Sequence, residues 1–142
     1  MMRTMQALKL KLSDIKLKAV IAGAVLDNAT TLFVMTLLAA TLVSTGLSED
    51  QVMSRMKSTS GLLLGLIIGL GCTGLGGYVA GRMAKQAEVL HGLLVAVIGM
   101  VIALIFREIG VPAWFDILGF AAMLPAGMAG GYLAERRRVG RI

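Results

Sequence analysis

One carboxylate stands inside a long apolar stretch of this 142-residue sequence, Asp27 in AGAVLDNATTLF. A carboxylate near the middle of a bilayer costs ~2.5–3.5 kcal/mol on insertion scales, so such a residue is expected to face the interior of a helix bundle or a water-filled path. On a helix, Thr30 and Thr31 share a face with Asp27, and Asn28 lies at its edge. These four residues are predicted to form either an ion or proton site or a polar clasp to a neighbouring helix, and both alternatives stay open.

Other chemistries lack the residues that they need. His91 is the only histidine and Cys72 the only cysteine, so one chain cannot build a metal site from several imidazole or thiolate ligands. The sequence pattern offers no Ser/His/Asp or Cys/His set and no paired carboxylates within the membrane. The glycines of GLGCTGLGG lie inside an apolar stretch with no strand before them, which argues against dinucleotide binding. We expect no enzyme activity, no catalytic residues, no metal and no cofactor.

The composition is that of a membrane protein. Hydrophobic residues make up 57% of the chain and charged residues 15%, whereas soluble domains carry about 25% charged residues. The net charge of +6 comes from Lys and Arg that lie mostly at the ends of the apolar stretches. That distribution is typical of orientation signals and not of a basic stripe that binds nucleic acid. We therefore expect membrane lipids, and no nucleic acid, as partners.

Four apolar stretches are long enough to cross a bilayer, since about 20 helical residues span ~30 Å of hydrocarbon. They are residues 19–43, 61–80, 89–106 and 114–133. Open strands are excluded because lipid leaves backbone groups unpaired. The predicted fold is an all-α integral membrane protein with four transmembrane helices.

Basic residues divide the chain into three parts: a basic N-terminal arm (1–18), a transmembrane domain (19–135) and a basic C-terminal tail (136–142). Lys and Arg are concentrated in the arm, in the tail and between the second and third apolar stretches. Because positive charge accumulates on the cytoplasmic side, both termini are predicted to be cytoplasmic. The arm either lies on an anionic membrane face or serves only as an orientation signal.

The connection between the first two stretches, LSEDQVMSRMK, predicts a short interfacial helix. Ser48 and Gln51 have the spacing of a capping box, in which each side chain bonds the other residue's backbone N–H.

Small residues recur every four positions along the second apolar stretch and give that helix one nearly bare face. In lipid, such faces favour helix association because backbones can approach closely. The fourth stretch carries a weaker version. We expect these helices to pack tightly, either within the chain or against a second copy or a larger membrane complex. The predicted packing residues are Gly61, Gly65, Gly69, Gly77, Gly81, Gly127 and Gly131.

The phrases GGYVAGR, from Gly76, and GGYLAER, from Gly130, end the second and fourth stretches. They suggest a worn duplication of a helical hairpin with both copies in the same orientation. Tyr is expected at the headgroup level and Arg at the phosphates. His91 is expected at the interface as a residue of a helix start, with a mutual hydrogen bond to Glu88. The predicted interface anchors are Tyr78, Arg82, His91, Trp114, Tyr132 and Arg136.

At GAVLDNATTLF, GGYVAGRMAKQAEVLHGLLVAVIG and GGYLAERRR, the chain resembles a broad group of small prokaryotic four-span membrane proteins, largely of unknown function. The resemblance covers most of residues 20–136 and implies a multi-pass protein of the prokaryotic cytoplasmic (inner) membrane. It implies no activity. The sequence departs from the group at Asn28, Thr30 and Thr31, where smaller or more apolar residues are expected. The resemblance draws attention to Asp27, Gly76, Gly77, Arg82, His91 and Gly92.

Two functions are consistent with these patterns. The first is a non-enzymatic structural or accessory membrane protein that associates with itself or with a complex through its glycine faces. The second is a small channel or transporter for protons, cations or small solutes that uses Asp27.

Overall fold

The computed structural model describes residues 15–107 and 110–140, and this part of the chain is helical with no strand. Four helices are long and apolar enough to cross a membrane. The four predicted spans are therefore confirmed as helices, and the chain has the helices of a multi-pass membrane protein. The described elements are α2 (Leu17–Ser44), α3 (Glu49–Lys57), α4 (Thr59–Ala84), α5 (Glu88–Ile105) and α6 (Ala113–Val139).

The helix ends differ from the predicted ends by a few residues. Most of the predicted basic arm lies outside the described residues, and α2 already begins at Leu17. At the other end, α6 continues through Pro125 and ends at Val139. The first arginines of the predicted basic tail are thus part of a helix. The cytoplasmic placement of both termini and the hairpin repeat stay predictions.

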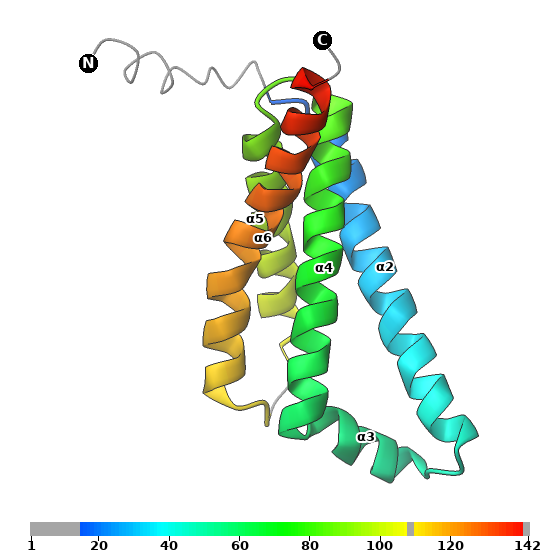
Figure 1. The fold of residues 1–142 in the computed structure, drawn as a ribbon. Helices are drawn as coiled ribbons and strands as arrows, with labels where there is room; N and C mark the ends of the chain where they lie inside the picture. Colours follow the sequence, from blue (N-terminus) through cyan, green and yellow to red (C-terminus); the bar gives the residue numbers. More distant parts are fainter. Residues whose placement is uncertain (1–14, 108–109, 141–142) are drawn as a thin grey trace.

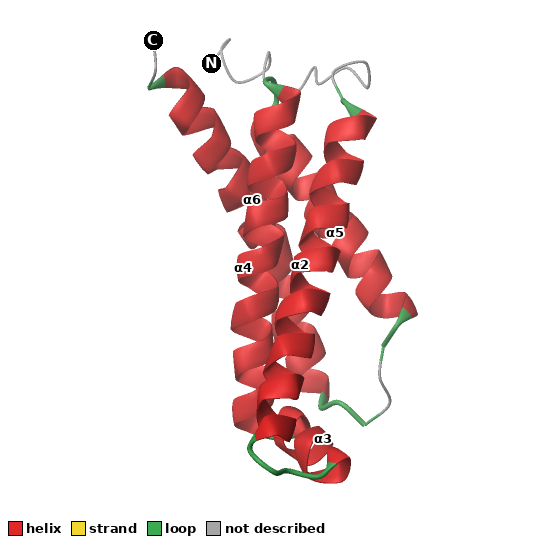
Figure 2. Ribbon diagram, turned by 90° about the vertical axis from the view of Figure 1, so that its right-hand side faces the viewer, coloured by secondary structure: helices red, strands yellow, loops and turns green. Residues whose placement is uncertain are grey.

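The start of α2 and the end of α6 lie at one end of the bundle, here called the terminal end, and α3 lies across the opposite end, here called the loop end (Figure 1; Figure 2). α4 packs against α2, α5 and α6. Toward the loop end, α2 diverges from α4, and α3 bridges the two (Figure 1).

The predicted capping box forms at the start of α3. The Ser48 backbone N–H donates to Gln51 Oε1 at 2.9 Å, and the Gln51 N–H donates to Ser48 Oγ at 3.4 Å. These bonds satisfy two backbone donors that the first turn of a helix leaves free. The chain therefore turns from α2 into α3 at a defined residue.

Backbones meet directly in the terminal half of the bundle, where glycines remove the side chains between helices. A Cβ added to Gly76 would lie 2.6 Å from the carbonyl oxygen of Gly23, and one added to Gly77 would lie 2.5 Å from that of Gly127. Gly92 faces the same Gly127 oxygen at still closer range. We call Gly23, Gly76, Gly77, Gly92 and Gly127 the glycine seam. It joins α2, α4, α5 and α6 with no room for a methyl group.

The remaining predicted packing glycines have different surroundings. Gly81 lies against Ala134, and Gly131 against the backbone of Glu88, so both also pack within the chain. Gly61 lies against the last turn of α3. Gly65 meets only Met35 Cε at 3.5 Å, and Gly69 has no atom within 4 Å of its added Cβ. The four-residue ridge of α4 is therefore tight at the terminal end and open in its middle, which its regular spacing did not predict.

The difference between tight and open glycines predicts opposite effects of one substitution. Gly77→Ala should lower the free energy of unfolding by about 1–3 kcal/mol, because the methyl group cannot fit against Gly127. Gly69→Ala should leave stability unchanged or raise it by up to about 1 kcal/mol, because Ala is the better helix former and the site is open. Unfolding of both variants in mixed micelles, followed by circular dichroism, measures the difference. Equal losses would contradict the assignment of the seam.

Candidate functional site

Asp27 is buried in the bundle, with 4% of its surface exposed. The Thr73 hydroxyl lies 3.3 Å from Asp27 Oδ1 and 3.2 Å from Oδ2 and donates to the carboxylate. Thr73 occupies the place of a glycine in the four-residue ridge of α4, so the ridge that lets α4 approach α2 also carries the partner of Asp27. Asp27 therefore makes a polar contact with a neighbouring helix, and its partner comes from α4.

Glycines make room for this carboxylate. A Cβ added to Gly99 of α5 would lie 3.2 Å from Asp27 Oδ2, and one added to Gly76 would lie 2.9 Å from Asp27 Cβ. A larger side chain at either position would displace Asp27 or its helix. Three helices thus shape the space around one carboxylate.

The other predicted polar residues of α2 divide into two groups. Asn28 and Thr31 line a cavity together with Asp27. The Asn28 amide also donates to the backbone oxygen of Ala24 at 2.8 Å, within its own helix. Thr30 is not among the lining residues. The structure therefore brings three of the four predicted residues together.

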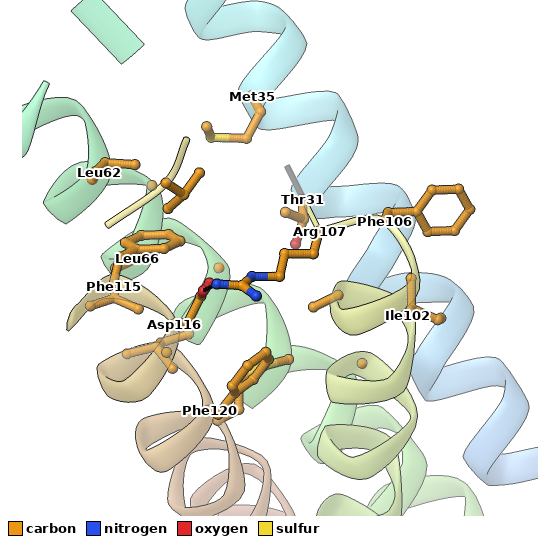
Figure 3. Close-up of a pocket in the computed structure, with 18 of the residues that line it drawn as sticks. Thr31, Met35, Leu62, Leu66, Ile102, Phe106, Arg107, Phe115, Asp116 and Phe120 are labelled. Carbon is orange, nitrogen blue, oxygen red and sulfur yellow. Dashed lines mark ion pairs between the residues drawn. The ribbon is translucent and has the colours of Figure 1, made fainter. Parts of the chain in front are cut away.

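The cavity, here called the chamber, measures about 490 Å³. Its walls are mostly apolar and come from all five described helices, and Figure 3 shows several of these side chains around it. Small-molecule sites typically occupy ~300–1,000 Å³ and combine apolar walls with a few polar groups. The apolar lining residues include Met35, Met53, Leu62, Leu66, Ile102, Phe115, Phe120 and Met123.

Asp27 stands at the closed end of the chamber. The lining residues nearest the terminal end are Asp27 on α2, Thr73 on α4, Gly99 on α5 and Met123 on α6. One turn further on, the glycine seam begins, and Val20, Ala80 and Val95 form a fully packed cluster behind it. The chamber therefore extends from Asp27 toward the loop end.

An ion pair lies near the loop end of the chamber. Arg107 Nη2 and Asp116 Oδ2 are 2.6 Å apart, and Figure 3 shows the two side chains directed toward one another across the space between α5 and α6. Lys57 also lines this end. The loop end thus carries two basic groups and one acidic group, whereas the terminal end of the chamber carries Asp27 without a basic lining residue.

His91 lies in the first turn of α5 as predicted, and it is fully buried within the bundle. The backbone N–H of Lys16 donates to its Nε2 at 3.0 Å, and Nδ1 lies 2.9 Å from the Ala87 oxygen. An N–H can only donate, so Nε2 accepts and Nδ1 carries the hydrogen. The predicted hydrogen bond between His91 and Glu88 is not formed. Glu88 Oε1 instead pairs with Arg138 Nε at 2.6 Å.

The predicted interface anchors occupy different environments. The Tyr78 hydroxyl accepts hydrogen bonds from Arg82 of α4 and Arg137 of α6. Its counterpart Tyr132 is 53% exposed, and Arg136 is exposed as well. Trp114 stacks edge-on against Phe115, with ring centroids 6.0 Å apart. The two GGY phrases thus end in unlike surroundings.

Comparison with known proteins gives no match to a family model, a curated protein or a solved structure. Within the described residues, no three His, Cys, Asp or Glu side chains are grouped so as to hold a metal ion. The candidate site therefore depends on its own geometry.

Sequence reasoning missed Thr73 as the partner of Asp27 and missed the Arg107–Asp116 pair. The hydroxyl that interrupts a glycine ridge was the available signal for Thr73.

The contact between Asp27 and Thr73 predicts a stability loss on removal of one hydroxyl. Thr73→Val keeps the shape and should lower the free energy of unfolding by about 1–3 kcal/mol, because a buried carboxylate loses one of its donors. Thr30→Val is the matched control on α2 and should change it by less than about 0.5 kcal/mol. Thr73→Ser keeps the hydroxyl and should therefore retain most of the stability that Thr73→Val loses. Equal thermal stability of the two valine variants in detergent would argue against the contact.

Proposed function

We propose that this chain is a small multi-pass membrane transporter that binds a lipophilic cation in the chamber. The observation that carries the proposal is a buried carboxylate at the closed end of a mostly apolar cavity whose other charged lining residues, Lys57, Arg107 and Asp116, lie at the opposite end.

The charge of the solute follows from what surrounds Asp27. A buried ionised carboxylate requires a cationic partner, since desolvation of an unpaired charge is costly. Its hydrogen-bond donors, the hydroxyls of Thr73 and Thr31, are neutral and cannot balance the charge. A solute cation can supply that balance, and a proton can supply it when the chamber is empty. One carboxylate could thus serve two cations in turn.

The shape of the cavity favours a carrier over an open pore. The chamber ends at Asp27, and the glycine seam closes the bundle beyond it. Passage to the terminal end requires α2 and α4 to separate at Gly23 and Gly76. The nearest atoms at these two glycines belong to backbone and to the side chains of Asp27, Ala80 and Val95, so such a separation begins without moving an aromatic side chain.

The accessory role is the second candidate. Its motivating feature was the row of small residues, which were expected to pack either within the chain or against another chain. Gly77, Gly81, Gly127 and Gly131 lie against helices of the same chain, so they support that role less than the sequence suggested. Association with a second copy or a larger complex, and the prokaryotic inner membrane as location, remain part of what we propose for this protein.

Binding of a lipophilic cation tests the proposed transporter. Tetraphenylphosphonium should bind the purified protein in detergent, and Asp27→Asn should weaken this binding by about tenfold or more, because the counter-charge is lost. Asp50→Asn makes the same chemical change at an exposed position of α3 outside the chamber and should bind as the wild type does. Isothermal titration calorimetry measures both.

Transport is then measured in proteoliposomes with an imposed pH gradient. The wild type and Asp50→Asn should accumulate the cation, and Asp27→Asn should not. Equal binding and flux in the wild type and Asp27→Asn would exclude a role of Asp27 in transport and would favour the accessory role.

A further inference from the structure

A second cavity, lined mainly by charged residues, lies at the terminal end of the bundle, far from the chamber along α4. It measures about 280 Å³ and is formed where α4 and α6 end side by side (Figure 1). Its charged lining residues are Arg82, Lys85, Glu88, Arg137 and Arg138. We call it the terminal cavity.

Two arginines at this cavity converge on one neutral atom. Arg82 Nη1 donates to the Tyr78 hydroxyl at 3.3 Å, and Arg137 Nη1 donates to the same oxygen at 3.4 Å. Both guanidinium groups also lie near the Tyr78 ring, at 5.9 and 5.7 Å from its centroid. Two like charges from different helices are therefore held close together by a single phenol.

The one acid at the cavity does not balance these charges. Glu88 is buried and pairs with Arg138 Nε at 2.6 Å. Among the described residues, no carboxylate forms an ion pair with Arg82, Lys85 or Arg137. Three cations thus share one small cavity with no counter-charge from the described part of the chain, and an anion would relieve their mutual repulsion.

A phosphate group fits this arrangement chemically. Guanidinium groups present paired N–H donors that match phosphate oxygens, and charge-assisted hydrogen bonds of this kind are about twice as strong as neutral ones. Lys85 can add a point charge. Each arginine donates to Tyr78 through Nη1, and within the described part of the chain neither guanidinium group makes a further hydrogen bond, so their other N–H groups are available to an anion.

We propose that the terminal cavity binds the phosphate of an anionic phospholipid headgroup between α4 and α6. The location favours a lipid over free phosphate. Arg82 and Arg137 stand in the last turns of two candidate membrane helices, and exposed apolar side chains of the same helices, Leu75 and Leu133, follow toward the bundle centre. A headgroup in the cavity would leave its acyl chains along these apolar surfaces. This site is independent of the proposed transport.

Native mass spectrometry of the detergent-solubilised full chain, titrated with phosphatidylglycerol, tests the proposal. The wild type should retain the lipid, whereas phosphatidylcholine of the same chain length should bind more weakly. Arg137→Gln should weaken phosphatidylglycerol binding by about tenfold. Arg136→Gln removes the same charge one residue away, outside the cavity, and should bind as the wild type does.

Further arms identify the source of the phosphate and the role of Tyr78. Inorganic phosphate at millimolar concentration should not displace the lipid. Tyr78→Phe keeps all charges but removes the shared acceptor, and should cause a smaller loss than Arg137→Gln. The arginines are exposed, and circular dichroism should show wild-type helix content in each variant. Equal losses in Arg136→Gln and Arg137→Gln, no loss in either, or displacement by inorganic phosphate would each overturn the proposal.

Discussion

Direct backbone contact between helices is the constraint on which the rest of the structure depends. At the glycine seam, α2 and α4 meet at Gly23 and Gly76 without intervening side chains. At the loop end, α3 separates the same two helices. Straight helices held together at one end and apart at the other leave a space between them. The chamber is that space. Asp27 lies at its closed end because Asp27 follows Gly23, the seam residue of α2, by one helical turn.

The buried polar residues are satisfied in ways that differ with their depth. Near the terminal end, Glu88 has a cationic partner in Arg138, and both nitrogens of His91 have backbone partners. Deeper in the bundle, Asp27 has a hydroxyl partner from Thr73. Ionisable groups in a bilayer are costly unless paired, and they often mark functional sites. Asp27 has only neutral partners, whereas Glu88 has a cationic partner and both nitrogens of His91 are hydrogen-bonded. Asp27 is therefore the buried ionisable residue that best fits a functional role.

Much of the fold could be predicted from the sequence, but less of the site. Long apolar stretches predicted the four long helices, because the length and composition of a stretch suffice to identify a candidate membrane helix. Ser48 and Gln51 predicted the start of α3, because a capping box involves only residues close together in the sequence. The pairing of Asp27 with Thr73 spans 46 positions, and it depends on the rotation of two helices, which spacing within one helix does not determine. For the same reason, Arg137 was not foreseen beside Tyr78, and Gly69 was not distinguished from Gly77.

The hydrogen bond between Lys16 and His91 has a consequence for the order of assembly. The backbone N–H of Lys16 is one of the free donors at the start of α2, and its acceptor lies 75 positions later in the chain. A ribosome delivers α2 to the membrane before α5 has been synthesised. The acceptor for this end of α2 therefore becomes available only after α5 has been synthesised, whereas α4, which meets α2 at Gly23 and Gly76, precedes α5 in the chain.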